Sequence, residues 1–391
     1  MVSATKLSQT IEQFRSNVPA LKNKAYMNFG AQGVLAQETI DAIGQSYSWV
    51  QQHGPLSGKV FGWLMQELRD TRQAFADEFG CAAANLALTQ STTDGCNIVL
   101  WGLPWQAGDD LLITDAEHAG VIAATHQLAK RHNLNLRVCP VVGRSEDQIL
   151  QTLEQQLTDK TRVFLFSHIL WTTGQTLPIK EIIDLCRSRG VLTLVDGAQS
   201  AGVLDLDLPA SKADCYAVTG HKWLGGPDGV GALYLTDEAI ERLEPTFVGW
   251  RSSKFDSHGA PSGWEEGAAR FEVATAPFPL LAATRKAIYI RREHGTAGER
   301  YQLVLDNATR LRGALSALNG VQCLSSKAPT SGLVSFKVEG GSHRQICDEL
   351  ERQQIIVRTL PSPDCLRASL HYFTSEDEIK KLISVLAPLT A

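Results

Sequence analysis

The cysteine patterns of zinc sites and of disulfide-linked domains are missing from this sequence. Its eight cysteines are spread over 391 residues without a CxxC pair and without a Cys/His cluster. Clustered thiols and imidazoles are typical of zinc sites, and closely spaced cysteines are typical of small disulfide-linked domains. We therefore expect no metal site and no disulfide framework, and most of the thiols should be small buried apolar side chains.

Long apolar runs and an excess of basic residues are also missing. The first 17 residues are polar and mixed in charge, and no later stretch is long and apolar enough to cross a bilayer. The formal net charge is −5, and the lysines and arginines are scattered rather than gathered in a stripe that could follow a phosphate backbone. These features predict a soluble, cytoplasmic protein that binds neither membranes nor nucleic acids.

Short apolar runs alternate with helix-length amphipathic segments between about residues 85 and 235. The expected strands are Leu86–Thr89, Leu111–Thr114, Leu136–Val142, Arg162–Ser167, Val191–Val195, Cys215–Thr219 and Val230–Leu235. Amphipathic segments between them are Val121–His132, Glu146–Leu157 and Ile179–Arg189. Such alternation is typical of βαβ units, so we expect an α/β fold with a mostly parallel seven-stranded sheet.

The length of the chain indicates two domains rather than one. The sequence predicts a large domain over residues 26–270 and a smaller α/β domain made of residues 1–25 and 271–391. Residues 243–279 are rich in Gly, Pro, Ser and Trp and are expected to form loops and a crossover. A long helical stretch, Leu280–Ala317, is expected to follow.

The strongest chemical signal joins an acid and a lysine. Asp196 ends an apolar run, and Lys222 follows 26 positions later in Thr219-Gly220-His221-Lys222. Pyridoxal 5'-phosphate (PLP) needs a lysine to hold it as a Schiff base and an acid to keep its pyridine nitrogen protonated. Taken singly, Asp196 also fits a helix cap and Lys222 a solvated surface residue, but the pair predicts a PLP site.

Further residues fit the remaining parts of such a site. Ser91, Thr92 and Thr93 lie between a strand and a helix, where backbone N–H groups hold phosphate, although a plain helix cap has the same composition. Thr219 and His221 are expected to be further donors to the phosphate. His118 follows a strand and is expected to stack on the cofactor ring, whereas a lone histidine is more often structural.

These motifs resemble the fold-type I PLP enzymes of aminotransferase class V, and among them the cysteine desulfurases and selenocysteine lyases. The resemblance extends from about Asn28 to Phe373 and implies a fold-type I PLP-dependent transferase fold. It implies that Asp196 pairs with the ring nitrogen and Gln199 with the ring hydroxyl. It also implies that Arg367 and Arg358 bind substrate, and that Thr275 reaches the phosphate bound to the partner subunit of a homodimer.

Two positions depart from the family pattern. Trp171 occupies the place of an asparagine near the cofactor hydroxyl, so that hydrogen bond is expected to be absent or replaced. Cysteine desulfurases carry a nucleophilic cysteine on a loop after the segment that contains Arg358, but residues 360–364 here contain none. Cys365, two residues before Arg367, is expected to be a framework residue rather than a mobile nucleophile.

The pattern resembles that of the cystine C–S lyases. It implies β-elimination of L-cystine, and less readily of L-cysteine, to give pyruvate, ammonia and a persulfide that could supply sulfur to an iron–sulfur apoprotein. Trp250 and Arg251 are expected near the mouth of the site, against the distal half of cystine; a tucked ring and a solvated arginine fit the sequence equally well. The alternatives are a desulfurase that uses Cys365, another class V aminotransferase or hydrolase, and a non-catalytic scaffold.

Overall fold

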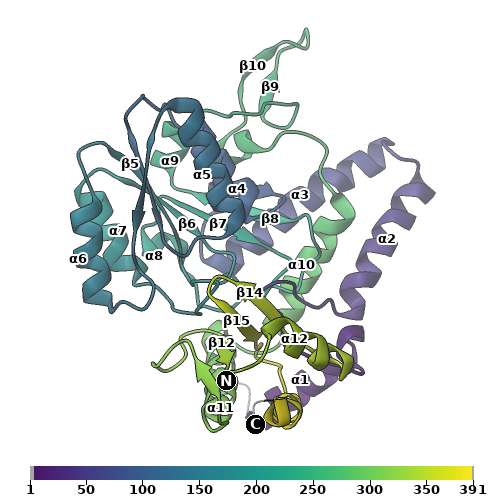
Figure 1. Ribbon diagram of the computed structural model, residues 1–391. Coiled ribbons are helices and arrows are strands. Elements are labelled where there is room, and N and C mark those ends of the chain that lie inside the picture. Colours follow the sequence, from purple (N-terminus) through teal and green to yellow (C-terminus); the bar gives the residue numbers. More distant parts are fainter. Residues whose placement is uncertain (1–3, 390–391) are drawn as a thin grey trace.

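A seven-stranded sheet forms the centre of the computed structural model, which describes residues 4–389 (Figure 1). The strand order is β2-β8-β7-β6-β5-β3-β4. Strand β8 pairs antiparallel with both of its neighbours, and the pairs among the other adjacent strands are parallel. The strands are β2 (Leu86–Thr89), β3 (Asp110–Thr114), β4 (Asn135–Cys139), β5 (Thr161–Ser167), β6 (Leu192–Asp196), β7 (Cys215–Thr219) and β8 (Gly231–Leu235). The prediction of a mostly parallel seven-stranded sheet is confirmed.

Helices cover both faces of this sheet, so β6, β7 and β8 are buried along their whole length, whereas β4 at the edge is partly exposed. Leu111, Leu165 and Leu194 face helices α4, α5 and α9, whereas Phe164 and Val195 face α3, α6, α7 and α10 (Phe278–Arg292). The helices of this part of the chain are α2 (Gln37–His53), α3 (Gly58–Phe79), α4 (Thr92–Gly102), α5 (Ala119–His132), α6 (Glu146–Gln156), α7 (Ile179–Ser188), α8 (Leu208–Ser211) and α9 (Asp237–Arg242). Short 3₁₀ turns lie at η1 (Pro19–Leu21), η2 (Ala83–Asn85), η3 (Gly267–Phe271) and η4 (Ala387–Leu389).

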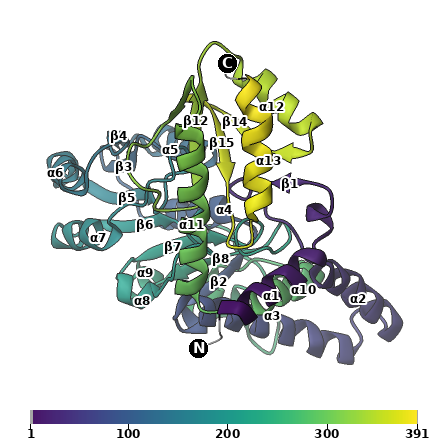
Figure 2. The same ribbon diagram turned by 90° about the horizontal axis from the view of Figure 1, so that it is seen from below.

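A second, four-stranded sheet lies in the C-terminal part, with order β11-β12-β15-β14 and antiparallel pairing (Figure 2). It has its own apolar core. Its strands are β11 (Val321–Cys323), β12 (Leu333–Val338), β14 (Arg358–Pro361) and β15 (Asp364–Ser369), and its helices are α11 (Ala297–Ser316), α12 (His343–Arg352) and α13 (Glu376–Leu386). This sheet and its helices form the expected second α/β unit.

The N-terminal segment packs against this C-terminal part. Arg15 in α1 (Ala4–Ser16) forms a 2.9 Å ion pair with Glu378 in α13. Strand β1 (Ala25–Tyr26) pairs in parallel with β13 (Ile355–Ile356). The domain boundaries at residues 25 and 270 remain a prediction.

Two local expectations need correction. The helical stretch Leu280–Ala317 is two helices, α10 (Phe278–Arg292) and α11, because Gly295 has φ +86° and Thr296 then caps α11 through a reciprocal bond with Glu299. Residues 243–279 are not only loop, since β9 (Ser253–Phe255) and β10 (Pro261–Trp264) form the projecting hairpin in Figure 1.

Within residues 4–389 no helix is long and apolar enough to span a membrane.

Candidate active site

A cavity of about 190 Å³ opens where the carboxyl ends of β5, β6 and β7 meet. Ser167, Asp196 and Thr219 are the last residues of these three strands, and each of them lines the cavity. In open parallel sheets this edge is where ligands bind, because loops and helix N-termini converge there. Ten predicted site residues line the cavity: Ser91, Thr92, Thr93, His118, Asp196, Gln199, Thr219, His221, Lys222 and Arg358.

Lys222 and Asp196 shape the charge of this cavity. Burial lowers the pKa of the Lys222 ammonium, Asp196 opposes this effect, and the nearby cations Arg367 and Arg358 add to it, which together bring the pKa to about 8. Burial raises the pKa of Asp196, although a 2.9 Å hydrogen bond from the Ala198 N–H favours the carboxylate. A lysine with a lowered pKa is readily deprotonated, which both covalent attachment and proton removal require.

The N-terminus of α4 forms one end of the cavity. Ser91 caps the helix by accepting a hydrogen bond of 3.2 Å from the Asp94 N–H. The hydroxyl oxygen of Thr92 is buried without a hydrogen-bond partner. Thr219 and His221 share a 2.6 Å hydrogen bond between Oγ1 and Nδ1. A free buried hydroxyl at a helix N-terminus is suited to an anionic group.

His118 is the N-cap of α5, and its environment fixes its tautomer. Its Nδ1 accepts a 3.1 Å hydrogen bond from the Gly120 N–H, so a neutral ring carries its proton on Nε2. Burial lowers the pKa of this imidazole, and the Lys222 charge lowers it further. The ring meets Trp171 edge to face at 5.7 Å between centroids. His118 therefore stands as a neutral, oriented ring at the cavity wall.

Trp171 forms hydrogen bonds within the protein. Its indole N–H donates to the carbonyl oxygen of Glu117 at 3.3 Å, and Glu117 does not line the cavity. Its own carbonyl oxygen accepts a 2.7 Å hydrogen bond from Arg367 Nη1. Trp171 thus links the wall that holds His118 to the arginine expected to bind substrate.

Glu117 is a buried carboxylate that the sequence analysis did not assign a role. It accepts hydrogen bonds from the Thr114 hydroxyl at 2.5 Å, the Ser167 N–H at 3.0 Å and the Ser167 hydroxyl at 2.8 Å. Burial and the Asp196 charge raise its pKa to about 7. In the sequence, only the position of Glu117 directly before His118 indicated that it lies near the site.

Gln199 is held from two sides. Its Nε2 donates to the Gly30 carbonyl oxygen at 2.8 Å, and its Oε1 accepts from the Trp223 indole N–H at 2.8 Å. An amide nitrogen has two N–H groups, so one remains for a ligand in the cavity that Gln199 lines. Gly30 and Ala31 also line the cavity, which the sequence analysis did not anticipate.

The two predicted substrate arginines are register partners on adjacent antiparallel strands, Arg358 on β14 and Arg367 on β15. Arg358 lines the cavity. Arg367 is fully buried, and its Nε and Nη2 atoms have no hydrogen-bond partner. Burial lowers its pKa to about 9. A buried guanidinium with two free donors is suited to an incoming carboxylate.

Five residues discussed in the sequence analysis are not among those that line the cavity of their own chain: Arg367, Thr275, Trp250, Arg251 and Cys365. Thr275 is exposed. Trp250 is 44% exposed, and Arg251 forms an ion pair with Glu272. Cys365 is fully buried, and burial raises the pKa of its thiol to about 11. The assignments of Trp250, Arg251 and Thr275 to substrate and partner phosphate stay predictions.

The family model for aminotransferase class-V matches residues 25–382. The chain belongs to the aminotransferase class-V family. This family's model spans both sheets and every cavity residue named above.

Several known proteins resemble this class-V chain over nearly its whole length. A complex of the cystine C–S lyase C-DES with its reaction product cysteine persulfide is 43% identical, with TM-score 0.92, and covers 95% of this chain and 99% of its own. A C-DES mutant with glycine covalently linked to its PLP cofactor is 42% identical, with TM-score 0.93, and covers 95% and 98%. The isopenicillin N epimerase of Streptomyces clavuligerus is 30% identical over 93% of this chain and 94% of its own length. A probable cysteine desulfurase of Pseudomonas aeruginosa is 32% identical over 78% and 77%.

The cavity residues fit PLP. The orphan Thr92 hydroxyl and the α4 N-terminus suit a phosphate, Asp196 suits a protonated ring nitrogen, and Lys222 is available for covalent attachment. The predictions of a fold-type I fold, of PLP as cofactor and of a class-V enzyme are therefore confirmed. When bound, PLP supplies an electron sink for negative charge that develops on an amino acid.

Proposed function

We propose that this enzyme cleaves L-cystine, and less readily L-cysteine, by β-elimination. It is a PLP-dependent carbon–sulfur lyase, and the family match and the C-DES structures support that class. The observation that carries the finer proposal is a cavity that combines Lys222 and Arg358 with no thiol among its lining residues. Such a site can hold an amino acid and remove its Cα proton, but it has no sulfur nucleophile.

The chain's own residues account for each part of this reaction. The free donors of buried Arg367 suit the substrate α-carboxylate, and Arg358 lies beside it. Lys222, whose pKa is about 8, takes the proton from Cα as a general base. The Cβ–S bond then breaks, and the electron pair leaves with sulfur as cysteine persulfide. One water hydrolyses the remaining three-carbon fragment to pyruvate and ammonia.

Desulfuration through Cys365 is disfavoured by its position. With a pKa of about 11, only about one thiol in 10⁴ is ionised at pH 7, against roughly one in 30 for an unperturbed cysteine. Cys365 is also fully buried and does not line the cavity. A buried, protonated thiol cannot attack a substrate sulfur.

The test is to give L-cystine to the PLP-loaded enzyme and assay pyruvate and ammonia, in parallel with Cys365→Ala. We expect equal amounts of the two products, and less than a twofold difference between the proteins. Alanine formed from cysteine, together with loss of activity in the variant, would instead identify a desulfurase with Cys365 as its nucleophile.

Amino-acid epimerisation is a second candidate, favoured by the 30% identity with isopenicillin N epimerase. It shares the removal of the Cα proton but returns a proton to the opposite face of Cα. In deuterated water an epimerase would yield a D-amino acid carrying deuterium at Cα and no pyruvate. Pyruvate formation from cystine at a rate far above that of enantiomer exchange would assign the lyase reaction.

We further propose that the enzyme is a cytoplasmic homodimer. The eight free thiols support a reducing compartment. Phe247, Val248 and Trp250 are 74%, 52% and 44% exposed, and such a patch close to Thr275 suits a subunit interface. In the dimer Thr275 would reach the phosphate bound to the partner subunit, and Trp250 and Arg251 would contact the distal half of cystine. The cysteine persulfide would then pass its sulfur to an iron–sulfur apoprotein. Sedimentation tests the dimer, and sulfur transfer to an apo-ferredoxin tests the acceptor.

A further inference from the structure

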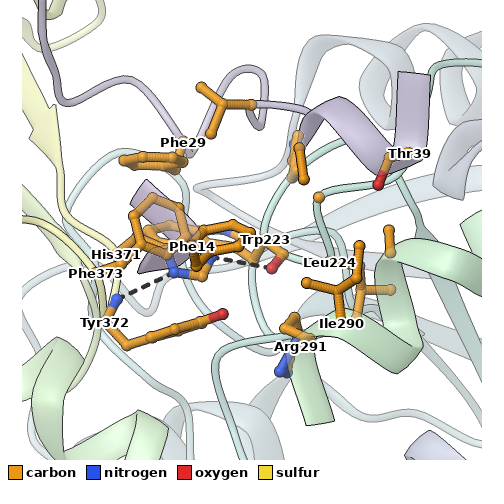
Figure 3. Close-up of a pocket in the computed structure, with 15 residues that line it drawn as sticks. Phe14, Phe29, Thr39, Trp223, Leu224, Ile290, Arg291, His371, Tyr372 and Phe373 are labelled. Carbon is orange, nitrogen blue, oxygen red and sulfur yellow. Dashed lines mark hydrogen bonds between the residues drawn. The ribbon is translucent and has the colours of Figure 1, made fainter. Parts of the chain in front are cut away.

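An aromatic junction lies directly behind Lys222. Figure 3 shows Phe14 from α1, Phe29 from the N-terminal segment, Trp223 from the loop that carries Lys222, and His371 and Phe373 from the segment after β15. Their rings contact one another, with His371 stacked on Phe373 at 4.2 Å and Phe29 edge to face with both. The chemical step described above uses none of these residues.

His371 is fixed as a hydrogen-bond donor toward the lysine loop. Its Nδ1 accepts a 3.1 Å hydrogen bond from the Tyr372 N–H, so a neutral ring carries its proton on Nε2. That nitrogen lies 3.0 Å from the Trp223 carbonyl oxygen. Figure 3 marks this hydrogen bond with a dashed line. The backbone of His371 is itself fixed, because its N–H donates to the Thr374 hydroxyl and its carbonyl accepts from Asn307.

The backbone is therefore held on both sides of Lys222. On one side the Gly33 N–H donates to the His221 carbonyl oxygen at 2.6 Å. On the other side His371 donates to the carbonyl oxygen of Trp223, which lies in the peptide bond between Trp223 and Leu224. A Cβ atom on Gly33 would lie 2.0 Å from the Lys222 carbonyl oxygen, so the contact with the N-terminal segment is as close as a glycine permits.

Trp223 extends this support into the cavity. Its side chain is 1% exposed, and its indole N–H donates to the Gln199 amide oxygen at 2.8 Å. That bond sets which end of the amide is the oxygen, and the Gln199 nitrogen must then face Gly30 and the cavity. Trp223 thus accepts a hydrogen bond from His371 of the C-terminal part and orients the amide of Gln199.

We propose that His371 and Trp223 are positioning residues for PLP chemistry. His371 holds the backbone that carries Lys222, and Trp223 orients Gln199, so that the C-terminal part and the lysine loop move as one body. This role rests on PLP binding alone and is independent of whether cystine is the substrate.

The first test compares Trp223→Phe with Trp101→Phe. Both changes remove an indole N–H that donates to a side-chain amide oxygen, since Trp101 donates to Asn97 at 3.0 Å outside the cavity. We expect Trp223→Phe to shift the pH midpoint of the bound cofactor's visible absorbance and to weaken PLP retention about fivefold, as expected for one lost hydrogen bond. Its kcat should fall while KM changes less than twofold, because the arginines are untouched. Trp101→Phe should leave all four quantities unchanged.

The second test uses His371. His371→Phe keeps a ring but loses the donor, whereas His371→Gln can place an amide N–H near the position of Nε2. We expect the first variant to shift the absorbance midpoint and the second to restore at least half of the shift. A residue that only fills the core would give no rescue, because glutamine packs worse than phenylalanine among aromatic rings.

A measurement on the unmodified protein covers the case in which these variants fail to fold. Removing PLP from the native enzyme should raise backbone hydrogen exchange in residues 371–374 and 29–33, but not in residues 96–105. The proposal is overturned if exchange in 371–374 is the same with and without PLP. It is equally overturned if folded Trp223→Phe and Trp101→Phe have the same cofactor absorbance and PLP affinity.

Discussion

Replacing Arg367 with leucine would separate ligand recognition from structural support. The guanidinium is fully buried, its Nη1 donates to Trp171, and its Nε and Nη2 atoms have no partner. In the protein without substrate, the change removes an unpaired buried cation and one hydrogen bond. Because these effects oppose each other, we expect the free energy of unfolding to fall by at most about 1 kcal/mol.

Substrate binding should respond very differently. A hydrogen bond to a charged group contributes about 1.5–3 kcal/mol, and the two free donors suit a bidentate carboxylate. Losing both bonds costs at least about 3 kcal/mol, which corresponds to a KM for cystine raised about 100-fold or more. The pKa of Lys222 should also rise, because Arg367 is one of the cations that lower it.

Arg300→Leu provides the control for stability. Arg300 is also buried, but its Nη1 donates to the carbonyl oxygens of Arg291 and Gly295, so its loss should cost about 1–3 kcal/mol while KM is unchanged. Urea unfolding of the cofactor-free variants and steady-state kinetics of the loaded ones measure both quantities. If Arg367→Leu loses more than 3 kcal/mol of stability and keeps its KM, Arg367 is a structural residue and the reasoning is wrong.

Three further predictions concern Lys222, Glu117 and Thr92; the first two are measured on the cofactor-free protein. Burial lowers the pKa of Lys222 from 10.5 to about 8, so between pH 8 and pH 10.5 the unfolded state binds more protons than the folded state. The free energy of unfolding should therefore rise with pH across that window. Lys222→Ala should lack this rise in urea titrations at several pH values. Burial raises the pKa of Glu117 from 4.5 to about 7, so this group should make the free energy of unfolding fall as pH rises across that range. Glu117→Gln should flatten the dependence of the free energy of unfolding on pH. Equal slopes in both proteins would contradict the raised pKa of Glu117. Thr92→Val removes a buried hydroxyl without a partner, so the thermal midpoint should not fall, while the PLP dissociation constant should rise about fivefold in a fluorescence titration. Unchanged PLP affinity would exclude Thr92 from the phosphate site.

Much of the architecture follows from the sequence by itself. A strand buried on both faces is a short run of apolar residues between turn residues, so β2 and β7 begin and end where their apolar runs do. Parallel strands place their carboxyl ends at one edge, and this is why Asp196, Thr219 and Ser91, far apart in the chain, could be expected in one cavity. The Asp196–Lys222 pattern then indicated the cofactor, because few other functions need that acid and that lysine together.

Other features were decided only by the tertiary structure. The direction of β8, the hairpin at residues 253–264 and the break at Gly295 depend on pairing and backbone angles that periodicity does not encode. The free donors of Arg367 and the link from His371 through Trp223 to Gln199 join residues from separate parts of the chain. A sequence specifies which side chains prefer to be buried, but whether a buried polar atom finds a partner depends on where distant segments meet. Residue types thus identified the chemistry of this enzyme, and long-range packing determined which groups remain free to perform it.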